Sequence, residues 1–339
     1  MEEPPRGHSM TSIDVAIPNF NYGRYLRACV ESVLRQDVPA LRILIIDNAS
    51  TDDSWEVAQQ LAAEDARITL VRHRCNLGHH ASFNEAIDWA ASEAFMILCA
   101  DDLLTEGSLS RALSVLQQNP DVTFAFGELA PDQPFLGNDP SGKLDADWHL
   151  MPAAALLEHF CRSGLFLVRS CSALVRTEAQ KQAGYYSTAL DQSDDFELVM
   201  RLTLQGGLVA RTHLPQLFMR DHEHERSAIV RRDRRLQILA YEAAFDWFFS
   251  HEGASHPEAD RLARLAARGL VGRAYWSGMS HLYRGDFRNA AGLFRYVIGR
   301  SWPAIVLPPL DYLPNRKVAT GQDDAITGAI RRILPARWI

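Results

Sequence analysis

Two adjacent carboxylates, Asp101 and Asp102, follow the apolar run "AFMILCA" and precede a pair of leucines. Two acids this close repel each other, so the arrangement requires a cation, a proton or full solvation. Mg²⁺ and related hard cations bind one or two protein carboxylates together with substrate phosphates. The pair is thus compatible with a metal-supported phosphate site, but taken alone it would favour a solvated acidic turn, and the rest of the sequence has to decide between them.

Strands and helices alternate around this pair. Short apolar runs predict strands, and stretches with apolar residues at helical spacing predict helices. This alternation predicts a parallel sheet with helices on both faces. The expected strands are 13–20, 41–50, 68–76 and 94–100, and the expected helices are 25–36, 51–66 and 81–92.

Polar residues gather where each expected strand ends. In a parallel α/β sheet, ligands bind at the carboxyl ends of the strands. A carboxylate such as Asp47 can accept from a base N–H or a ribose hydroxyl, and the asparagines and tyrosine of the first cluster can contact a base. A nucleotide is therefore a candidate ligand, with its diphosphate neutralised by a cation on the acid pair. The four clusters are 18–22, 47–54, 72–80 and 100–102.

The rest of the chain predicts a loop or lid and then more helices. Residues 130–148 are rich in Pro, Gly and Asp, and residues 193–207 predict a helix with a glycine stop. From about residue 231 the pattern changes to three long helical segments. We therefore expect a flexible segment 1–10, an α/β domain 11–230 and a helical extension 231–339.

Composition narrows the class of protein. The chain has 339 residues, 47% of them hydrophobic, which supports a sizeable core. Its formal net charge of -7 argues against nucleic acid as a partner. Five scattered cysteines without a Cys-x-x-Cys pair suit a reducing compartment, and no basic-apolar leader opens the chain. These features predict a cytoplasmic protein.

The helical extension suggests three roles: an oligomer interface, an acceptor-binding module or a contact with the inner membrane surface. Its segments "AYEAAFDWFF" and "AYWSGMSHLY" carry more aromatic residues than a solvated helix needs, which favours a homo-oligomer. The stretch 290–310 could rest on a membrane surface, but its arginines and prolines argue against a span.

Three common motifs are absent from the sequence. It contains no G-x-x-x-x-G-K-[ST] loop, no G-x-G-x-x-G after the first expected strand and no G-x-S-x-G elbow. NTPase, dinucleotide dehydrogenase and α/β-hydrolase functions therefore lose support.

Six segments in order resemble the family 2 glycosyltransferases, inverting enzymes with the GT-A fold. They are "IPNFNYGRYLRACVESVLRQ", "ILIIDNASTDDS", "NLGHHASFNEAI", "ILCADDLL", "GYYSTALDQSDDFELVMRL" and "RDHEHERS". The resemblance covers residues 11–230, about two thirds of the chain, and six ordered motifs are more specific than any single one. It implies a GT-A-like α/β domain with a mostly parallel central sheet flanked by helices, and a helical carboxyl-terminal extension.

The resemblance also implies the residues of the nucleotide pocket. Asp47 would contact the base, and Asp102 would lie on the cation or on a ribose. The remaining pocket residues would be Pro18, Asn21, Tyr22 and Asn76.

The metal ligands implied by the resemblance are Asp101 and His222, for Mg²⁺ or Mn²⁺. Asp101 matches the last acid of the family's D-x-D signature, and Cys99 stands where its first aspartate is usual. Because a thiol is a poor ligand for Mg²⁺, this departure weakens the metal prediction. His224, two residues after His222, is the alternative contact with the pyrophosphate.

On the acceptor side, "SDDFELVMRL" matches the family's acidic pair at the start of a helix. Asp195 would be the catalytic base that removes the proton from the acceptor hydroxyl, with Asp194 beside it. Capping of the helix is the structural alternative for both, and it is compatible with catalysis.

The implied reaction is transfer of a sugar, with inversion, from a nucleoside diphosphate sugar of UDP or dTDP type to an acceptor hydroxyl. A carbohydrate, a glycolipid or a small molecule would fit as acceptor. The first alternative is a non-catalytic nucleotide-sugar-binding subunit, which the Cys99 departure motivates. A sugar nucleotidyltransferase is the second, but "PNFNYGRY" lacks the glycine-rich, basic phosphate loop that such an enzyme needs.

Overall fold

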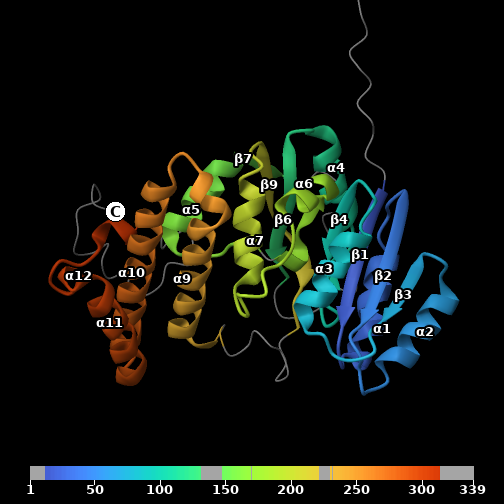
Figure 1. Cartoon of the computed structure of the whole chain (residues 1–339), viewed down its shortest axis with the longest axis horizontal. Helices are drawn as coiled ribbons and strands as arrows, with labels where there is room; N and C mark the ends of the chain where they lie inside the picture. Colours follow the sequence, from blue (N-terminus) through green and yellow to red (C-terminus); the bar gives the residue numbers. More distant parts are fainter. Residues whose placement is uncertain (1–11, 131–146, 169, 221–229, 231, 314–339) are drawn as a thin grey trace, which may run out of the picture. The chain divides into compact units, whose positions relative to one another are not determined.

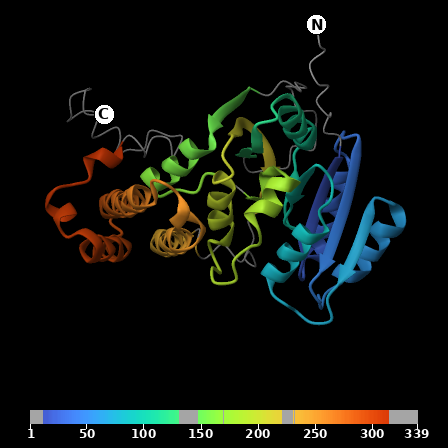
Figure 2. The same ribbon diagram turned by 45° about the horizontal axis from the view of Figure 1, so that its top comes forward.

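A computed structural model describes residues 12–130, 147–168, 170–220, 230 and 232–313 of the chain (Figures 1 and 2). The described residues divide into two compact units. The first comprises the described residues up to 153 together with 168–189 and 202–220, and the second comprises 154–167, 190–201 and the described residues from 230 to 313. The domain boundary at residue 230 stays a prediction, and segments 1–10 and 131–146 lie outside the described residues.

A nine-stranded sheet forms the first unit, with the order β3-β2-β1-β4-β8-β6-β9-β5 and β7 paired to β9. Figure 1 shows β3, β2 and β1 in blue beside β4. The strands are β1 (Ser12–Asn19), β2 (Ala40–Asp47), β3 (Ile68–Arg72), β4 (Ala94–Ile97), β5 (Leu103–Leu104), β6 (Val122–Leu129), β7 (Trp148–Pro152), β8 (Leu174–Arg176) and β9 (Leu208–Phe218).

The first four strands are parallel, as the alternating pattern predicts. β1 pairs with β2 and with β4, and β2 pairs with β3. The other half of the sheet is mixed, so the antiparallel pairs are confined to the strands beyond β4. There β8 is antiparallel to β4 and β6, and β5 and β7 are antiparallel to β9, although β6 and β9 are parallel. Antiparallel pairs need no crossover helix, so short strands can join this half without the alternation that a parallel sheet requires.

Helices cover both faces of the parallel half. α1 (Gly23–Leu34) and α4 (Ser108–Gln118) share one core cluster with Ile13, Val15 and Ile17 of β1. α3 (His79–Trp89) contacts β1 and β2, and α6 (Thr177–Ala183) contacts β4 and β8. Because side chains alternate across a strand, residues 43–47 can all be buried only if both faces are covered. α2 (Ser54–Glu64) packs against α1 and β3.

The second unit is helical. Phe196 lies at its centre, with ring centroids 5.3 Å from Phe160, 5.0 Å from Tyr241 and 5.1 Å from Phe245. α10 packs against α9 and α11, which Figure 2 draws in orange and red. The helices are α5 (Ala153–Ser163), α7 (Asp194–Thr203), α9 (Arg234–Ser250), α10 (Ala259–Tyr283), α11 (Phe287–Ser301) and α12 (Pro303–Val306). Short 3-10 turns are η1 (Ser170–Ser172), η2 (Glu252–Ser255) and η3 (Leu310–Tyr312).

Two buried arginines bind neighbouring groups within the second unit. Glu197 and Arg201 form an ion pair one turn apart on α7, with an N–O distance of 2.8 Å. Arg273 of α10 donates to the Gly164 carbonyl and, at 2.5 Å, to Gln237 of α9. Among the described residues, no helix combines the length and the apolar composition that crossing a bilayer would require.

Asp14 ties the amino ends of three strands of the first unit together. Its carboxylate is fully buried and accepts two bonds from Arg42 of β2, at 2.6 and 2.8 Å. It also accepts the backbone N–H groups of Ala91 and Ser92, just before β4, at 2.7 and 2.8 Å. Burial alone would raise the pKa of this carboxyl, but these donors outweigh it and hold the pKa below its ordinary value.

We predict that Asp14→Asn lowers the free energy of unfolding by about 2–4 kcal/mol, because buried donors lose a charged acceptor. A depressed pKa stabilises the fold above the ordinary aspartate pKa of about 3.9, and this contribution is lost as the pH falls through the folded value. The difference in unfolding free energy between the wild type and Asp14→Asn should therefore be largest above about pH 5. It should shrink when the urea titrations are repeated at lower pH.

Asp65→Asn is the matched control for this prediction. Asp65 pairs with Arg67 at 2.8 Å, but the two side chains are 24% and 43% exposed. Loss of this ion pair should lower the free energy of unfolding by less than about 1 kcal/mol. Equal unfolding free energies for the two variants would contradict the role assigned to Asp14.

Candidate active site

The carboxyl ends of β1, β2 and β3 bring Asn19, Asp47 and Arg72 side by side, because these residues are register partners. Asn19 Nδ2 donates to Asp47 Oδ1 at 3.3 Å and to Ser50 Oγ at 3.2 Å. Asp47 Oδ2 accepts the Ser50 N–H at 3.3 Å and lies 3.3 Å from Arg72 Nε. Asp47 is fully buried, so a base N–H would have to share an oxygen that already has partners.

The turn after β1 is held by Asn21. This residue is exposed and has φ 59°, a left-handed conformation that asparagine tolerates better than most residues. Its Oδ1 accepts the Thr51 N–H at 2.7 Å, and its own N–H donates to Ser50 Oγ at 2.9 Å. Pro18 and Tyr22, on either side, are half-buried. The structure thus brings Pro18, Asn21 and Tyr22 to the same sheet edge as Asp47.

Asn48 organises the loop that contains Asn76, a role that the sequence pattern does not reveal. Asn48 Nδ2 donates to Asn76 Oδ1 at 3.0 Å, and its Oδ1 accepts the Leu77 N–H at 2.9 Å. The His73 ring lies between Asn48 Oδ1, 2.8 Å from Nδ1, and Glu85 Oε2, 2.6 Å from Nε2. The sequence signal that could have identified Asn48 is its position directly after Asp47, at the end of an expected strand.

The acid pair lies in a tight turn after β4, in which the Asp102 N–H donates to the Cys99 carbonyl at 3.0 Å. Asp101 is 7% exposed and Asp102 is 4% exposed. Burial of both carboxylates rules out the solvated acidic turn. Asp102 Oδ1 accepts the Arg220 N–H at 3.3 Å, and the Arg220 guanidinium lies 5.0 Å from the centroid of the Tyr25 ring.

Two sulfur atoms lie beside this turn. Cys99 Sγ is 3.2 Å from Cys171 Sγ, and the two thiols form a cluster with an Asp102 oxygen in which all three atoms lie within 4.8 Å of one another. The hydrogen bond to Cys171, together with burial, raises the pKa of the Cys99 thiol well above its ordinary value. The carboxylates of Asp101 and Asp102 fit a hard cation such as Mg²⁺, but the thiols do not.

The acidic pair of the second unit opens a helix, as predicted. α7 begins at Asp194, and Asp195 Oδ1 accepts the Phe196 N–H at 2.7 Å. Asp194 is buried and Asp195 is half-buried. Both acids lie in the first turn, where the helix dipole favours a negative charge. His222 and His224 lie outside the described residues.

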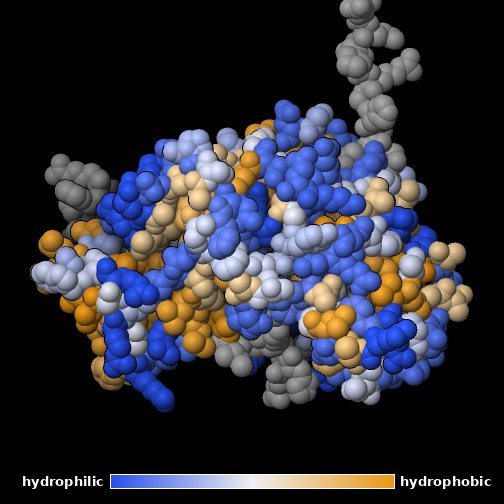
Figure 3. All heavy atoms as spheres, in the orientation of Figure 1, coloured by the Kyte–Doolittle hydropathy of each residue, from blue (hydrophilic) through white to orange (hydrophobic). Residues whose placement is uncertain are grey.

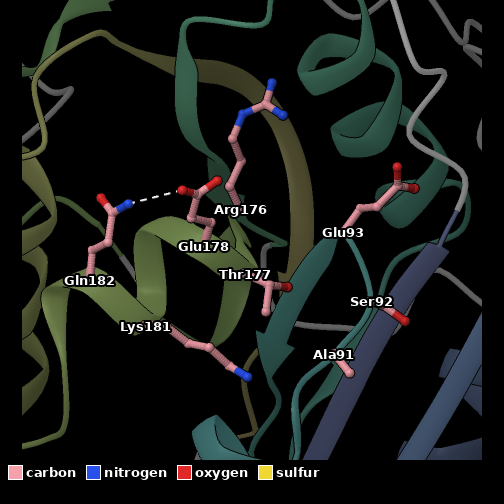
Figure 4. Close-up of a pocket in the computed structure, with 8 residues that line it drawn as sticks. All are labelled: Ala91, Ser92, Glu93, Arg176, Thr177, Glu178, Lys181 and Gln182. Carbon is pink, nitrogen blue, oxygen red and sulfur yellow. Dashed lines mark hydrogen bonds between the residues drawn. The ribbon is translucent and has the colours of Figure 1, made fainter.

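A pocket of about 720 Å³ opens at the opposite edge of the sheet. Its lining includes Ser92 and Glu93, which precede β4, and Glu178 and Lys181 of α6 (Figure 4). Gln182 donates to Glu178 across one turn of α6 at 3.1 Å. This pocket is therefore separate from the predicted nucleotide site, which lies at the carboxyl ends of the strands.

Comparison with known proteins identifies the family of the chain. The family model described as glycosyl transferase family 2 matches residues 14–182, about half of the chain. The chain belongs to glycosyl transferase family 2. The match includes the strand ends that carry Asp47, Asn76, Asp101 and Asp102, and it stops before Asp194.

A curated relative of this family 2 glycosyltransferase is the GalNAc(5)-diNAcBac-PP-undecaprenol beta-1,3-glucosyltransferase of Campylobacter jejuni. It is 29% identical over 154 residues, which cover 44% of this chain and 49% of the relative. For the first curated relatives the match covers only 33–36% of their length.

Solved structures show the same fold as this family 2 chain. S. aureus TarS 1-349 in complex with UDP-GlcNAc has a TM-score of 0.54 at 14% identity, with 85% of this chain and 92% of that chain covered. The mannosyltransferase PcManGT from Pyrobaculum calidifontis, in complex with GDP-Man and Mn2+, has a TM-score of 0.53 at 17% identity, with 86% and 87% covered. The fold is of the GT-A type, as the motifs imply.

Proposed function

We propose that this chain transfers a sugar, with inversion, from a nucleoside diphosphate sugar of UDP or dTDP type to an acceptor hydroxyl, with Mg²⁺ or Mn²⁺ as cofactor. The observation that carries the proposal is the burial of Asp101 and Asp102 at the sheet edge that also holds Asp47. Buried paired acids need a counter-charge, and a divalent cation bound between them and a diphosphate supplies one. The complexes of TarS with UDP-GlcNAc and of PcManGT with GDP-Man and Mn2+ support the donor class.

The nucleotide would bind across the ends of the parallel strands. Asp47 would accept from the base, while Asn19 and Ser50 orient its carboxylate. The remaining contacts are proposed for Pro18, Asn21, Tyr22 and Asn76. Asn21 and Asn76 are each tied to a neighbouring loop by hydrogen bonds, so the pocket is largely formed before a donor arrives. Such preorganisation reduces the ordering cost of binding.

Asp101 and His222 would hold the cation, with Asp102 on the cation or on a ribose hydroxyl. A bound divalent cation would neutralise the diphosphate and stabilise it as a leaving group. The Arg220 N–H keeps the Asp102 carboxylate in place. The chain's own part is therefore to fix two carboxylates in a buried turn before the donor binds.

Asp195 would accept the proton of the acceptor hydroxyl as that oxygen attacks the anomeric carbon from the face opposite the nucleotide. Its carboxylate lies in the first turn of α7, where the Phe196 N–H and the helix dipole stabilise the ionised form that a base requires. Asp194 would position the acceptor beside it. The name of the Campylobacter relative indicates a lipid-linked acceptor for that enzyme, which supports a glycolipid among the acceptor classes.

We predict that Asp101→Ala weakens Mn²⁺-dependent binding of UDP or dTDP by about tenfold or more, equivalent to about 1.4 kcal/mol. Calorimetric titrations of UDP, dTDP and GDP, each with and without Mn²⁺, measure this effect. Glu106→Ala removes an exposed acid four residues beyond the pair and should leave the affinity unchanged. Nucleotide affinity that ignores both Mn²⁺ and Asp101→Ala would rule out the metal assignment.

We predict that Asp195→Asn lowers the transfer rate by a factor of about 100 or more while nucleotide affinity stays near that of the wild type. The amide keeps the size of the side chain but cannot take a proton. Asp191→Asn, at an exposed acid four residues earlier, is the matched control. Normal transfer by Asp195→Asn would reject this base. If the wild type binds nucleotide but turns over no donor, the non-catalytic subunit becomes the better interpretation.

We also propose a contact of the second unit with an anionic membrane surface. Trp302, Val306 and Leu307 are 68%, 70% and 74% exposed, and Figure 3 shows hydrophobic residues over α11 and α12 at the left. Residues 287–310 contain three arginines and no acid, in a chain with a net charge of -7. Exposed apolar side chains with nearby arginines suit the interface of an anionic bilayer.

The double change Val306→Asp and Leu307→Asp should abolish sedimentation with vesicles that contain an anionic lipid, and pure phosphatidylcholine vesicles should bind little of either protein. Leu77→Asp alters an exposed leucine of the first unit and serves as control. Light scattering on the same proteins tests the predicted homo-oligomer. A wild-type dimer that ignores vesicles, and that the double change converts to a monomer, would favour the oligomer instead.

A further inference from the structure

The approach of Cys99 and Cys171 follows from the sheet itself. β4 and β8 are antiparallel, with Ala94 opposite Arg176 and Phe95 opposite Val175. Cys99 follows the end of β4 by two residues, and Cys171 lies in the 3-10 turn η1, which leads into β8 and contacts β4. The Sγ–Sγ distance is 3.2 Å. The strand pairing and the contact of η1 with β4 thus bring the two sulfurs together.

Asp102 adds an oxygen to the two sulfurs. One of its carboxylate oxygens and the two Sγ atoms all lie within 4.8 Å of one another. Asp102 is 4% exposed, and its Oδ1 also accepts the Arg220 N–H at 3.3 Å. A hydrogen bond of this kind orients a metal-ligating carboxylate and limits its freedom. The turn that holds Cys99 also fixes Asp102, since the Asp102 N–H donates to the Cys99 carbonyl at 3.0 Å.

We infer that Cys99, Asp102 and Cys171 form a binding site for a thiophilic divalent cation of the Zn²⁺ class. Thiolate ligands select Zn²⁺ over Mg²⁺ and Mn²⁺, which prefer oxygen. Three protein ligands with an open fourth position are the arrangement of reactive zinc sites, where water or a substrate oxygen completes the tetrahedron. The site excludes Asp101, the ligand proposed for a hard cation, but it shares Asp102 with the proposed nucleotide and metal site. Metal binding by the two sulfurs does not depend on the transfer reaction.

The present geometry is close to that of a tetrahedral zinc site. Zn–S bonds of about 2.3 Å place two sulfurs about 3.8 Å apart. The two Sγ atoms, 3.2 Å apart, need only separate by a fraction of an ångström. Cys99 and Cys171 are half-buried, so a cation can reach them, while the buried Asp102 closes the inner side. The site is therefore accessible and nearly assembled.

Cobalt is a spectroscopic probe for this site. The full chain, reduced and stripped of metal with a chelator, should bind one Co²⁺ with a thiolate-to-cobalt charge-transfer band and the visible bands of a tetrahedral ion. Zn²⁺ should displace the cobalt and remove both signals. Cys99→Ser and Cys171→Ser should each weaken binding roughly 100-fold or more, because each removes a direct ligand. Cys75→Ser, at an exposed cysteine outside the cluster, should behave like the wild type.

Cys99→Asp provides a variant that keeps a ligand at this position. It should still bind Co²⁺, with a weaker charge-transfer band, and its preference for Zn²⁺ over Mn²⁺ should be smaller than that of the wild type. Circular dichroism of all variants verifies their folding. Failure of the wild type to bind Co²⁺, a spectrum without the thiolate band, or equal binding by the Cys99→Ser/Cys171→Ser double variant would overturn the assignment. Nucleotide titrations of the same proteins test the proposed transferase function separately.

Discussion

The in-register pairing of the parallel strands β1, β2 and β3 is the constraint on which the candidate site depends. Because Asn19, Asp47 and Arg72 are register partners, three polar side chains meet at one edge without any loop having to fold over them. A shift of one residue in β2 would turn Asp47 to the other face of the sheet. Its full burial and its partners Asn19 and Ser50 would then be lost. The continuous apolar pattern of residues 43–46 permits burial on both faces, so the strand-end polar contacts help to specify the register.

A buried pair of acids is costly unless the surrounding structure compensates for it. The turn after β4 supplies part of that compensation, since the Arg220 N–H bonds to Asp102 and the Arg220 guanidinium is held against Tyr25. Arg220 follows the end of β9, and β9 pairs with β5 directly after the acids. The short strand β5 thus connects the acid pair to a segment 118 residues further along the chain. This link explains why a strand of two residues matters to the site.

Local patterns were enough to predict the first half of the fold. Apolar runs located β1 to β4, and the acidic start of α7 located Asp194 and Asp195 at the beginning of a helix. β5 was missed because two residues show no periodicity, and β7 was missed because it begins at the end of the expected loop 130–148 and finishes at a proline. The role of Asn48 was missed as well, since its partners Asn76 and Leu77 lie 28 and 29 residues away. Such contacts depend on tertiary register, and no local pattern records them.

The same limit applies to Cys99. From the sequence, a cysteine in the place of an acid indicates only the loss of a hard ligand, because its neighbours along the chain are Leu98 and Ala100. The antiparallel pairing of β4 and β8 adds Cys171, 72 residues away, as a second sulfur at 3.2 Å. Ligand chemistry is a property of the whole donor set, so a change that weakens an oxygen site can create a mixed sulfur and oxygen site. The cysteine at residue 99 therefore does more than remove an oxygen ligand, because it adds a sulfur to a second donor set beside the acid pair.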